Sequence, residues 1–302
     1  MLLVERGKML KRIFLTGGNG FIGRNIREKL DGKYTIFSPS SWELDLLDRE
    51  AVTKYLKQNK ISDVIHSAVY NQKRRGKNPD ADFSSNMKMF FHLAEHSHNL
   101  DKIIYFGSGA EFDKSFPIHR VTEQDFGQKI PLLNDYGLSK YLINLQARQS
   151  ENIYNLRLFG VYGPHEDWKT CFISNLCCKA IYGLPLTIRQ ECVFDFLFVD
   201  DLMQPICDLL DSTPLHHDYN LCTGKPVHLT EIAEIVREIS GKDLEIQILN
   251  PGENLEYTGL PERFEKEYGL TMTGLQQGIE RLYHFYENCV DKIDFEILKQ
   301  TR

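Results

Sequence analysis

Residues 13–23 read IFLTGGNGFIG, an apolar run that breaks into glycines and then continues with helical spacing. This pattern is typical of a buried strand that turns into a helix, where free backbone N–H groups of the first helical turn can bind a pyrophosphate. Gly17 would permit the tight turn, Gly20 would let the backbone approach a phosphate, and Gly23 would let the helix pack on the sheet. Because glycines also mark strand-to-helix turns that bind nothing, this motif is weak evidence when it stands alone.

Apolar strands and helices alternate through the first half of the chain. The pattern predicts strands over residues 13–16, 34–37, 63–68, 102–106 and 155–158, and helices over 21–30, 49–58, about 84–98 and a segment that carries Tyr136. Continuously apolar strands separated by helices indicate a parallel sheet that is covered on both faces. We therefore expect an α/β fold with a doubly wound parallel sheet, the Rossmann arrangement.

The second half is less regular. It predicts strands over 194–199 and 244–249, and helices over 172–182, 201–210, 229–240 and 275–288. We expect a dinucleotide-binding Rossmann domain over residues 9–165 and a smaller, mainly substrate-binding domain over 166–302. Part of 195–222 is expected to return to the first domain.

A second pattern carries chemistry. Tyr136 and Lys140 are four residues apart and lie on one face of a predicted helix, while Ser108 ends a predicted strand, at the sheet edge where α/β proteins bind ligands. A lysine cation lowers the pKa of a nearby phenol because it stabilises tyrosinate. Tyr136 could then exchange a proton with a carbonyl or carbinol group whose hydride moves to or from nicotinamide, and Ser108 would bind the same oxygen. The alternative is an ordinary pair on a partly exposed helix.

The end of the second strand bears on the choice of cofactor. A free ribose 2′-hydroxyl usually meets an Asp or Glu there, but this chain reads FSPSS over 37–41. Without that carboxylate a 2′-phosphate meets no repulsion, and Ser38, Ser40 and Ser41 can hydrogen-bond it. The sequence therefore favours NADP over NAD, although no arginine follows the strand.

Several further motifs resemble the extended short-chain dehydrogenases/reductases, the NAD(P)-dependent epimerases, dehydratases and reductases of nucleotide sugars. These motifs are GGNGFIG, HSAV (66–69), Asn86, YFGSG, YGLSK, LRLFGVYGP (156–164) and DFLFVDDL (195–202). They cover roughly residues 10–210. The segment WELDLLDREAV (42–52) is similar to the branch that contains GDP-L-fucose synthase and dTDP-4-dehydrorhamnose reductase.

The resemblance implies a role for individual residues. It makes Ser108, Tyr136 and Lys140 the catalytic set, with Lys140 also holding the nicotinamide ribose, and places Asp45 and Leu46 beside the adenine. Together with the glycine turn and the serines after the second strand, this gives a predicted set of cofactor-binding residues: Gly17, Asn19, Gly20, Phe21, Ile22, Gly23, Ser38, Asp45, Leu46, Ala68, Tyr136 and Lys140. The substrate would contact Ser108, Gly109 and Ala110.

Departures from the family pattern narrow the reaction. The 4,6-dehydratases carry an acidic pair directly after the Ser or Thr, where this chain has Gly109 and Ala110. Glu111 follows, and on a continued strand it would point to the opposite face. GDP-L-fucose synthase epimerises with a Cys and a His, for which the nearest matches here are Ala110 and Cys171. Dehydration and 3,5-epimerisation are therefore not expected.

The substrate-binding side departs further. Relatives usually have an Arg before the DFLFVDDL motif that contacts the nucleotide diphosphate, but here the residue is Phe194. A second basic residue expected in a segment like RPxD is replaced by YTGLPERF (257–264). Arg189 and Arg263 are the candidates to substitute, although a solvated surface charge is the simpler reading of each.

The sequence therefore predicts an NAD(P)H-dependent reductase of a nucleotide-linked 4-keto-6-deoxy sugar. One alternative is an NAD(P)-dependent C4 epimerase of nucleotide sugars, which would use the same catalytic set. A second is a non-catalytic dinucleotide-sensing protein, which the YxxxK pattern disfavours.

Composition adds limits. The net charge of −6 gives no electrostatic footprint for nucleic acid, and no stretch approaches the ~20 apolar residues of a membrane span. The seven cysteines are scattered among apolar residues, as in a reduced cytoplasmic protein, and no spacing of His, Cys or carboxylates predicts a metal. We also expect a homodimer, because the 84–98 helix and the Tyr136 helix carry many apolar residues that relatives bury across a two-fold axis.

Overall fold

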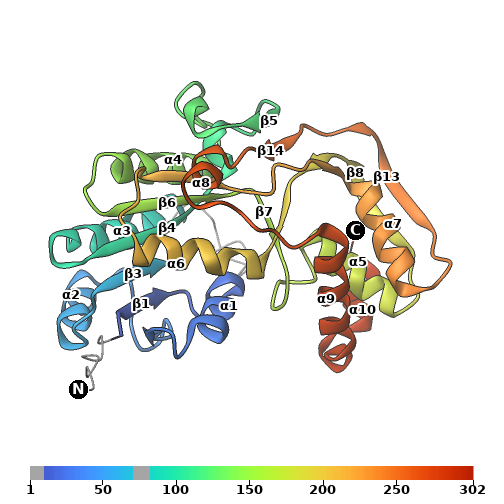
Figure 1. The fold of residues 1–302 in the computed structure, drawn as a ribbon. Coiled ribbons are helices and arrows are strands. Elements are labelled where there is room, and N and C mark those ends of the chain that lie inside the picture. The colour runs from blue at the N-terminus through green and yellow to red at the C-terminus, as the bar shows by residue number, and fades with distance from the viewer. Residues whose placement is uncertain (1–9, 71–81, 302) are drawn as a thin grey trace, which may run out of the picture. The chain divides into compact units, whose positions relative to one another are not determined.

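The computed structural model describes residues 10–70 and 82–301 of the chain (Figure 1). It divides into two compact units, Met1–Tyr105 and Phe106–Arg302. The domain boundary that the sequence predicts after residue 165 stays a prediction, and residue 9, where the first predicted domain begins, lies outside the described residues.

The first unit is built on parallel strands that alternate with helices. Its elements are β1 (Arg12–Thr16), α1 (Phe21–Leu30), β2 (Thr35–Phe37), α2 (Arg49–Gln58), β3 (Asp63–His66), α3 (Asp82–Ala94), the 3-10 turn η3 (Ser97–Asn99) and the start of β4 (Lys102–Ser108). Strand β1 pairs in parallel with β2 and with β3, and β3 pairs in parallel with β4. Every residue of β3 is buried, as expected for a strand that is covered on both faces.

Strand β4 ends in the second unit, where β6 (Ile153–Leu158) and β11 (Asp218–Leu221) form a parallel pair. The strand order of the parallel sheet is β11-β6-β4-β3-β1-β2. Between and after these strands the chain forms η4 (Gly109–Phe112), η5 (Glu123–Asp125), α4 (Asp135–Arg148), η6 (Val199–Leu202), α6 (Met203–Asp211) and α8 (Glu262–Tyr268). Helix α4 packs on η4 and on β6. The predicted doubly wound parallel sheet is confirmed.

Shorter sheets complete the second unit. One has the order β12 (Val227–His228), β9 (Val193–Phe194), β14 (Tyr257–Gly259), β5 (Ile118–Val121), while β8 (Leu186–Glu191) pairs with β13 (Ile246–Glu253) and β7 (Gly160–Tyr162) with β10 (Phe196–Phe198). The helices α5 (Phe172–Ile181) and α7 (Leu229–Ser240) pack on β8 (Figure 1). Helix α9 (Leu275–Glu287) packs on both of them, and α10 (Phe295–Gln300), which follows the 3-10 turn η7 (Val290–Lys292), packs on α5. Their shared core includes the fully buried Leu176, Ile232 and Leu282.

The single strand predicted over 194–199 is wrong. The structure has β9 and β10 in different sheets, with Asp195 between them. The Asp195 carboxylate is fully buried and accepts hydrogen bonds from the backbone N–H groups of Thr223 at 2.8 Å and Gly224 at 2.7 Å. A buried charge needs such donors, so the strand breaks where the carboxylate reaches the turn after β11.

Candidate functional site

The glycine turn of the first unit has the geometry that its spacing predicts. Gly17 has a φ of +70°, and a Cβ there would lie 2.7 Å from the backbone nitrogen of Ala68. A Cβ at Gly23 would lie 2.2 Å from the carbonyl oxygen of Gly17. A side chain would therefore clash at both positions. Gly17 lets the turn after β1 approach the backbone after β3, and Gly23 lets α1 pack on that turn.

Helix α1 begins at this turn with an open N-terminus. Its N-cap is the exposed Gly20, which supplies no side chain to bind the free N–H groups, and the first turn contains no acidic residue. The dipole and the N–H groups of such a terminus favour an anion. The turn therefore fits the diphosphate of a dinucleotide, with Phe21 and Ile22 in the first helical turn.

The serines after β2 already have partners in the first unit. The Ser38 hydroxyl donates to the carbonyl oxygen of Leu15 at 3.0 Å. The backbone N–H and the hydroxyl of Ser40 donate to one Glu43 carboxylate oxygen, at 2.7 and 2.8 Å, and these bonds lower the pKa of Glu43. Glu43, which the sequence pattern did not reveal, therefore brings a negative charge to Ser40, one of the serines predicted to bind a 2′-phosphate.

The remaining predicted cofactor residues of this unit lie on the loops that follow its strands: Asn19 after β1, Asp45 and Leu46 after β2, and Ala68 after β3. Asn19 accepts a bond from Arg27, the Asp45 side chain accepts from the N–H of Leu47, the Leu46 carbonyl meets His92, and the Ala68 N–H donates to Thr16. Gly18 was missed, although a Cβ there would lie 1.8 Å from the Ser38 hydroxyl oxygen. The second glycine of the GG pair was the signal that could have identified it.

In the second unit, helix α4 presents Tyr136 and Lys140 on one face. Asn134 caps the helix by accepting a bond from the N–H of Gly137, where a Cβ would lie 2.6 Å from the carbonyl oxygen of Ala110. Tyr136 is 46% exposed. The Lys140 Nζ lies 5.6 Å from the centroid of the Tyr136 ring and donates to the carbonyl oxygen of Phe106 at 2.6 Å.

Lys140 is a buried cation at this position. Burial lowers the pKa of Lys140 to about 8, and the nearby Glu111 carboxylate partly opposes that shift. Most of the Lys140 population is therefore still protonated at neutral pH. A cation fixed beside a phenol is the arrangement that eases proton transfer from that phenol.

Ser108 ends β4 and caps the 3-10 turn η4. Its hydroxyl oxygen accepts from the N–H of Ala110 at 3.2 Å and lies 3.2 Å from the Tyr257 hydroxyl oxygen. Its own N–H donates to Glu111 at 3.1 Å. The strand does not continue past Ser108, as the predicted alternation of side chains assumed. The chain instead turns into η4, and this turn directs Glu111 into the protein.

A buried ionic network holds this turn in place. The Arg157 guanidinium binds Glu111 at 2.8 Å and Asp218 at 3.1 Å, and all three side chains are at most 2% exposed. Arg263 also binds Asp218. The structure therefore places Arg263 in this network, 19% exposed, while Gly109 and Ala110 are buried next to Ser108.

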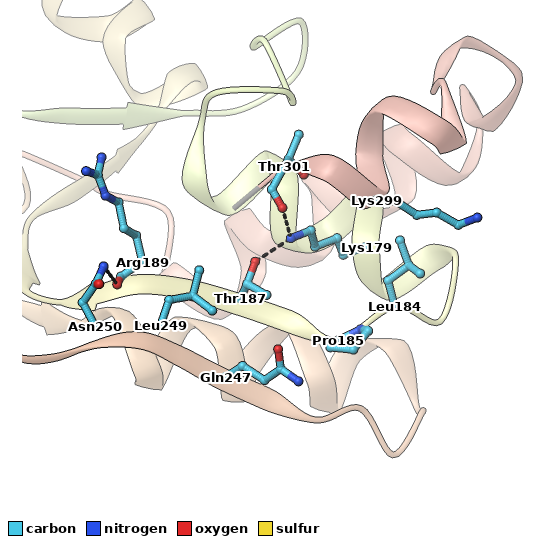
Figure 2. Close-up of a pocket in the computed structure, with 10 residues that line it drawn as sticks. All are labelled: Lys179, Leu184, Pro185, Thr187, Arg189, Gln247, Leu249, Asn250, Lys299 and Thr301. Atoms are coloured by element: carbon cyan, nitrogen blue, oxygen red, sulfur yellow. Dashed lines mark hydrogen bonds between the residues drawn. The ribbon is translucent and has the colours of Figure 1, made fainter.

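Arg189 lies elsewhere in the second unit, on β8. It lines a pocket of about 860 Å³ together with Lys179, Leu184, Pro185, Thr187, Gln247, Leu249, Asn250, Lys299 and Thr301 (Figure 2). The buried Lys179 amine donates to Thr187 and to the carbonyl oxygen of Thr301, and burial lowers its pKa. The Arg189 side chain is exposed and lies at the opposite end of the pocket from Lys299 (Figure 2).

Tyr257 is the residue of this site that the sequence did not reveal. It stands on β14 and is 5% exposed, yet its hydroxyl meets Ser108 across 149 residues of chain. The segment that begins with Tyr257 replaces the RPxD-like sequence of relatives, and that replacement was the sole sequence signal.

Within the described residues, His, Cys, Asp and Glu side chains form no group of three or more that could hold a metal ion. The helices of these residues also include none that is both long and apolar enough to span a membrane. Of the seven cysteines, Cys171 and Cys289 are partly exposed and the others are buried.

Residues 13–222 match the model of the NAD dependent epimerase/dehydratase family. This span is more than half of the 302 residues and contains both the glycine turn and the Ser108, Tyr136 and Lys140 set. The chain belongs to this family. The resemblance inferred from the motifs is therefore confirmed, and so is the prediction of an NAD(P)-dependent oxidoreductase or epimerase.

Family members similar to this chain carry different names. The GDP-L-colitose synthase of Yersinia pseudotuberculosis is 25% identical over 253 residues, which cover 76% of this chain and 82% of the relative. The UDP-glucose 4-epimerase of Bacillus subtilis is 24% identical over 315 residues, covering 85% and 91%. A solved GDP-mannoheptose C4 reductase from Campylobacter jejuni with NADP bound has a TM-score of 0.78 at 20% identity, covering 93% and 99%. This structural likeness shows a shared fold.

Proposed function

We propose that this family member is an NADPH-dependent reductase of a nucleotide-linked 4-keto-6-deoxy sugar. The observation that carries the proposal is the buried Lys140 cation beside the Tyr136 ring, on a helix whose unit also holds the Ser108 hydroxyl. The names of the GDP-L-colitose synthase and the GDP-mannoheptose C4 reductase support a nucleotide-linked sugar as the substrate class, and the second name supports reduction at C4.

Each side chain has a defined part in the reduction. The Ser108 hydroxyl binds the keto oxygen, Tyr136 donates its proton to that oxygen, and Lys140 stabilises the tyrosinate that forms. Nicotinamide, when bound, supplies the hydride for the keto carbon. Tyr136 is 46% exposed, so a substrate can reach its hydroxyl.

The residues next to Ser108 support simple hydride transfer. Gly109 and Ala110 provide no acid or base, and the Glu111 carboxylate is fully buried against Arg157. An elimination of water needs a further proton donor and acceptor at the sugar. These three positions supply neither, which favours reduction over dehydration.

The second candidate is a C4 epimerase, and the likeness to the Bacillus subtilis UDP-glucose 4-epimerase supports it. An epimerase returns its hydride to the sugar and consumes no cofactor, whereas a reductase oxidises one NADPH for each product molecule. Incubation with a nucleotide-linked 4-keto-6-deoxy sugar and NADPH distinguishes them. We expect the absorbance at 340 nm to fall in proportion to the sugar added, and a constant absorbance with substrate present would reject the reductase.

Substrate phosphates require a cation that is not already neutralised. Arg263 is bound to Asp218, whereas Arg189 is an exposed side chain on the rim of the pocket shown in Figure 2. We therefore favour Arg189 over Arg263 as the residue that replaces the usual phosphate-binding Arg at Phe194.

We expect NADPH to bind more tightly than NADH, because no carboxylate directly ends β2. Glu43 competes for the donors of Ser40, so Glu43→Gln should increase the affinity for NADPH and leave that for NADH unchanged. Quenching of protein fluorescence measures both constants. Equal or reversed affinities in the unaltered protein would mean that the serines after β2 receive no phosphate.

The homodimer also remains a proposal. Phe91 on α3 is 43% exposed, and Leu138, Leu142 and Leu145 on α4 are only partly buried in the chain on its own. We expect light scattering at micromolar concentration to give twice the chain mass of 35.1 kDa. A monomer mass would return these side chains to the packing of a single chain. The cytoplasmic location stays a prediction.

A further inference from the structure

We propose that Tyr257 is a positioning residue for Ser108, donating its phenolic proton to the Ser108 hydroxyl and thereby directing the serine proton toward the substrate oxygen. This inference rests on the proposed function, because it assigns the purpose of Ser108 in that reaction. It concerns a residue that neither the motifs nor the family match identifies, since residues 13–222 do not include it.

The phenol is held firmly from several sides. Strand β14 pairs in parallel with β5 and β9, which fixes the backbone of Tyr257. Its ring centroid lies 5.4 Å from that of Phe159 and 5.3 Å from that of Phe194. The Lys114 amine lies 4.1 Å from the same centroid. With the side chain 5% exposed, the hydroxyl has little freedom to leave Ser108.

We assign Tyr257 as the donor because, within the described residues, the Ser108 oxygen is the one hydrogen-bond acceptor that its buried hydroxyl has. Burial raises the pKa of Tyr257, and the neighbouring Tyr136 and Glu111 add to the rise, although the bond to Ser108 opposes it. The phenol therefore keeps its proton throughout the neutral range and can donate it to Ser108. The Ser108 oxygen also accepts from the N–H of Ala110 at 3.2 Å.

With both acceptor positions of the Ser108 oxygen filled, its own proton is the one left to bind the substrate. Hydrogen bonds in a chain polarise one another, so two incoming donors make the serine a better donor. The keto oxygen gains negative charge as hydride arrives. A serine that is fixed as a donor stabilises this charge without first having to reorient.

Gly109 independently supports the pairing. A Cβ at this position would lie 2.7 Å from the Tyr257 hydroxyl oxygen and 2.7 Å from Cδ1 of Phe159. The phenol therefore occupies the space beside Ser108 that a side chain at position 109 would need. Gly109, which stands where the dehydratases have an acidic residue, thus leaves the space that the Tyr257 side chain fills.

A double-mutant cycle tests the inference on kcat and KM. We expect Tyr257→Phe to lower kcat about tenfold with KM changed less than twofold, because a donor to the serine is lost while the binding surface stays. In a Ser108→Ala background the same change should have no further effect, since its route to the substrate is already gone. Tyr286→Phe is the matched control, because it removes another buried phenolic bond, to the carbonyl oxygen of Glu166 at 3.1 Å, and should leave kcat unchanged.

Two kinetic results would overturn the inference: a wild-type kcat in Tyr257→Phe, or an equal loss of kcat in the presence and absence of Ser108. The cycle is measured on whichever reaction the unaltered protein catalyses, reduction or epimerisation, because both use the serine. Failure of reduction alone therefore rejects the proposed function and not the role of Tyr257. Urea unfolding of the same four proteins tests the contact without turnover, and an absence of coupling between the two substitutions would contradict it.

Discussion

We expect Tyr136→Phe to lower kcat by about 10²-fold or more and to leave folding and cofactor affinity nearly unchanged. The substitution removes only the hydroxyl that donates the proton, while the ring keeps its place 5.6 Å from the Lys140 amine. Reduction without this donor must take its proton from water, which is neither positioned nor acidified by a cation. Steady-state kinetics with saturating NADPH measures the loss.

Tyr141→Phe is the matched control on the same helix. Tyr141 is buried five residues further along α4 and stacks on Phe126 at 4.6 Å, so its hydroxyl has no part in the proposed reaction. We expect this variant to retain kcat within a factor of about two. Equal losses in the two variants, or unchanged turnover in Tyr136→Phe, would refute the catalytic assignment.

Arg157→Leu should lower the free energy of unfolding by about 3–5 kcal/mol. Arg157 is completely buried and is the shared partner of Glu111 and Asp218, two carboxylates that are themselves at most 2% exposed. Leucine fills much of the volume but leaves one carboxylate without its cation and the other with only Arg263 and the more distant Arg148. Such an uncompensated buried charge is among the costliest defects a core can carry. Urea denaturation followed by circular dichroism gives the value.

Arg148→Ala serves as the control within the same network. Its guanidinium lies 3.6 Å from Asp218 and its side chain is 36% exposed, so water already screens much of the attraction. We expect a loss below about 1 kcal/mol. Should Arg157→Leu cost no more than Arg148→Ala, the network would not be what holds Glu111 and the turn after Ser108 in place.

The parallel sheet could be predicted because its strands are short apolar runs separated by helices, a local pattern. The helix 21–30 and the helix 49–58 have the predicted bounds for the same reason. The strand over 194–199 failed because Asp195 looks like any polar residue in a strand until its partners, Thr223 and Gly224, are known. Buried carboxylates depend on contacts that sequence spacing does not record.

The candidate site divides in the same way. Tyr136 and Lys140 were predictable because one helix turn separates them, and Ser108 because it ends a strand. Tyr257 was not, since it reaches Ser108 through β14, which pairs with strands distant in sequence. Glu43 was missed because its effect on Ser40 depends on the loop that follows β2.

The most direct test of the central claim follows a label from cofactor to sugar. The protein is incubated with a nucleotide-linked 4-keto-6-deoxy sugar and with NADPH that carries deuterium at the transferable position of nicotinamide C4, and the product is examined by NMR. We predict one deuterium on the sugar carbon that held the keto group, with an equal amount of NADP⁺ formed. An unlabelled sugar product, with the deuterium still on the cofactor, would contradict the account.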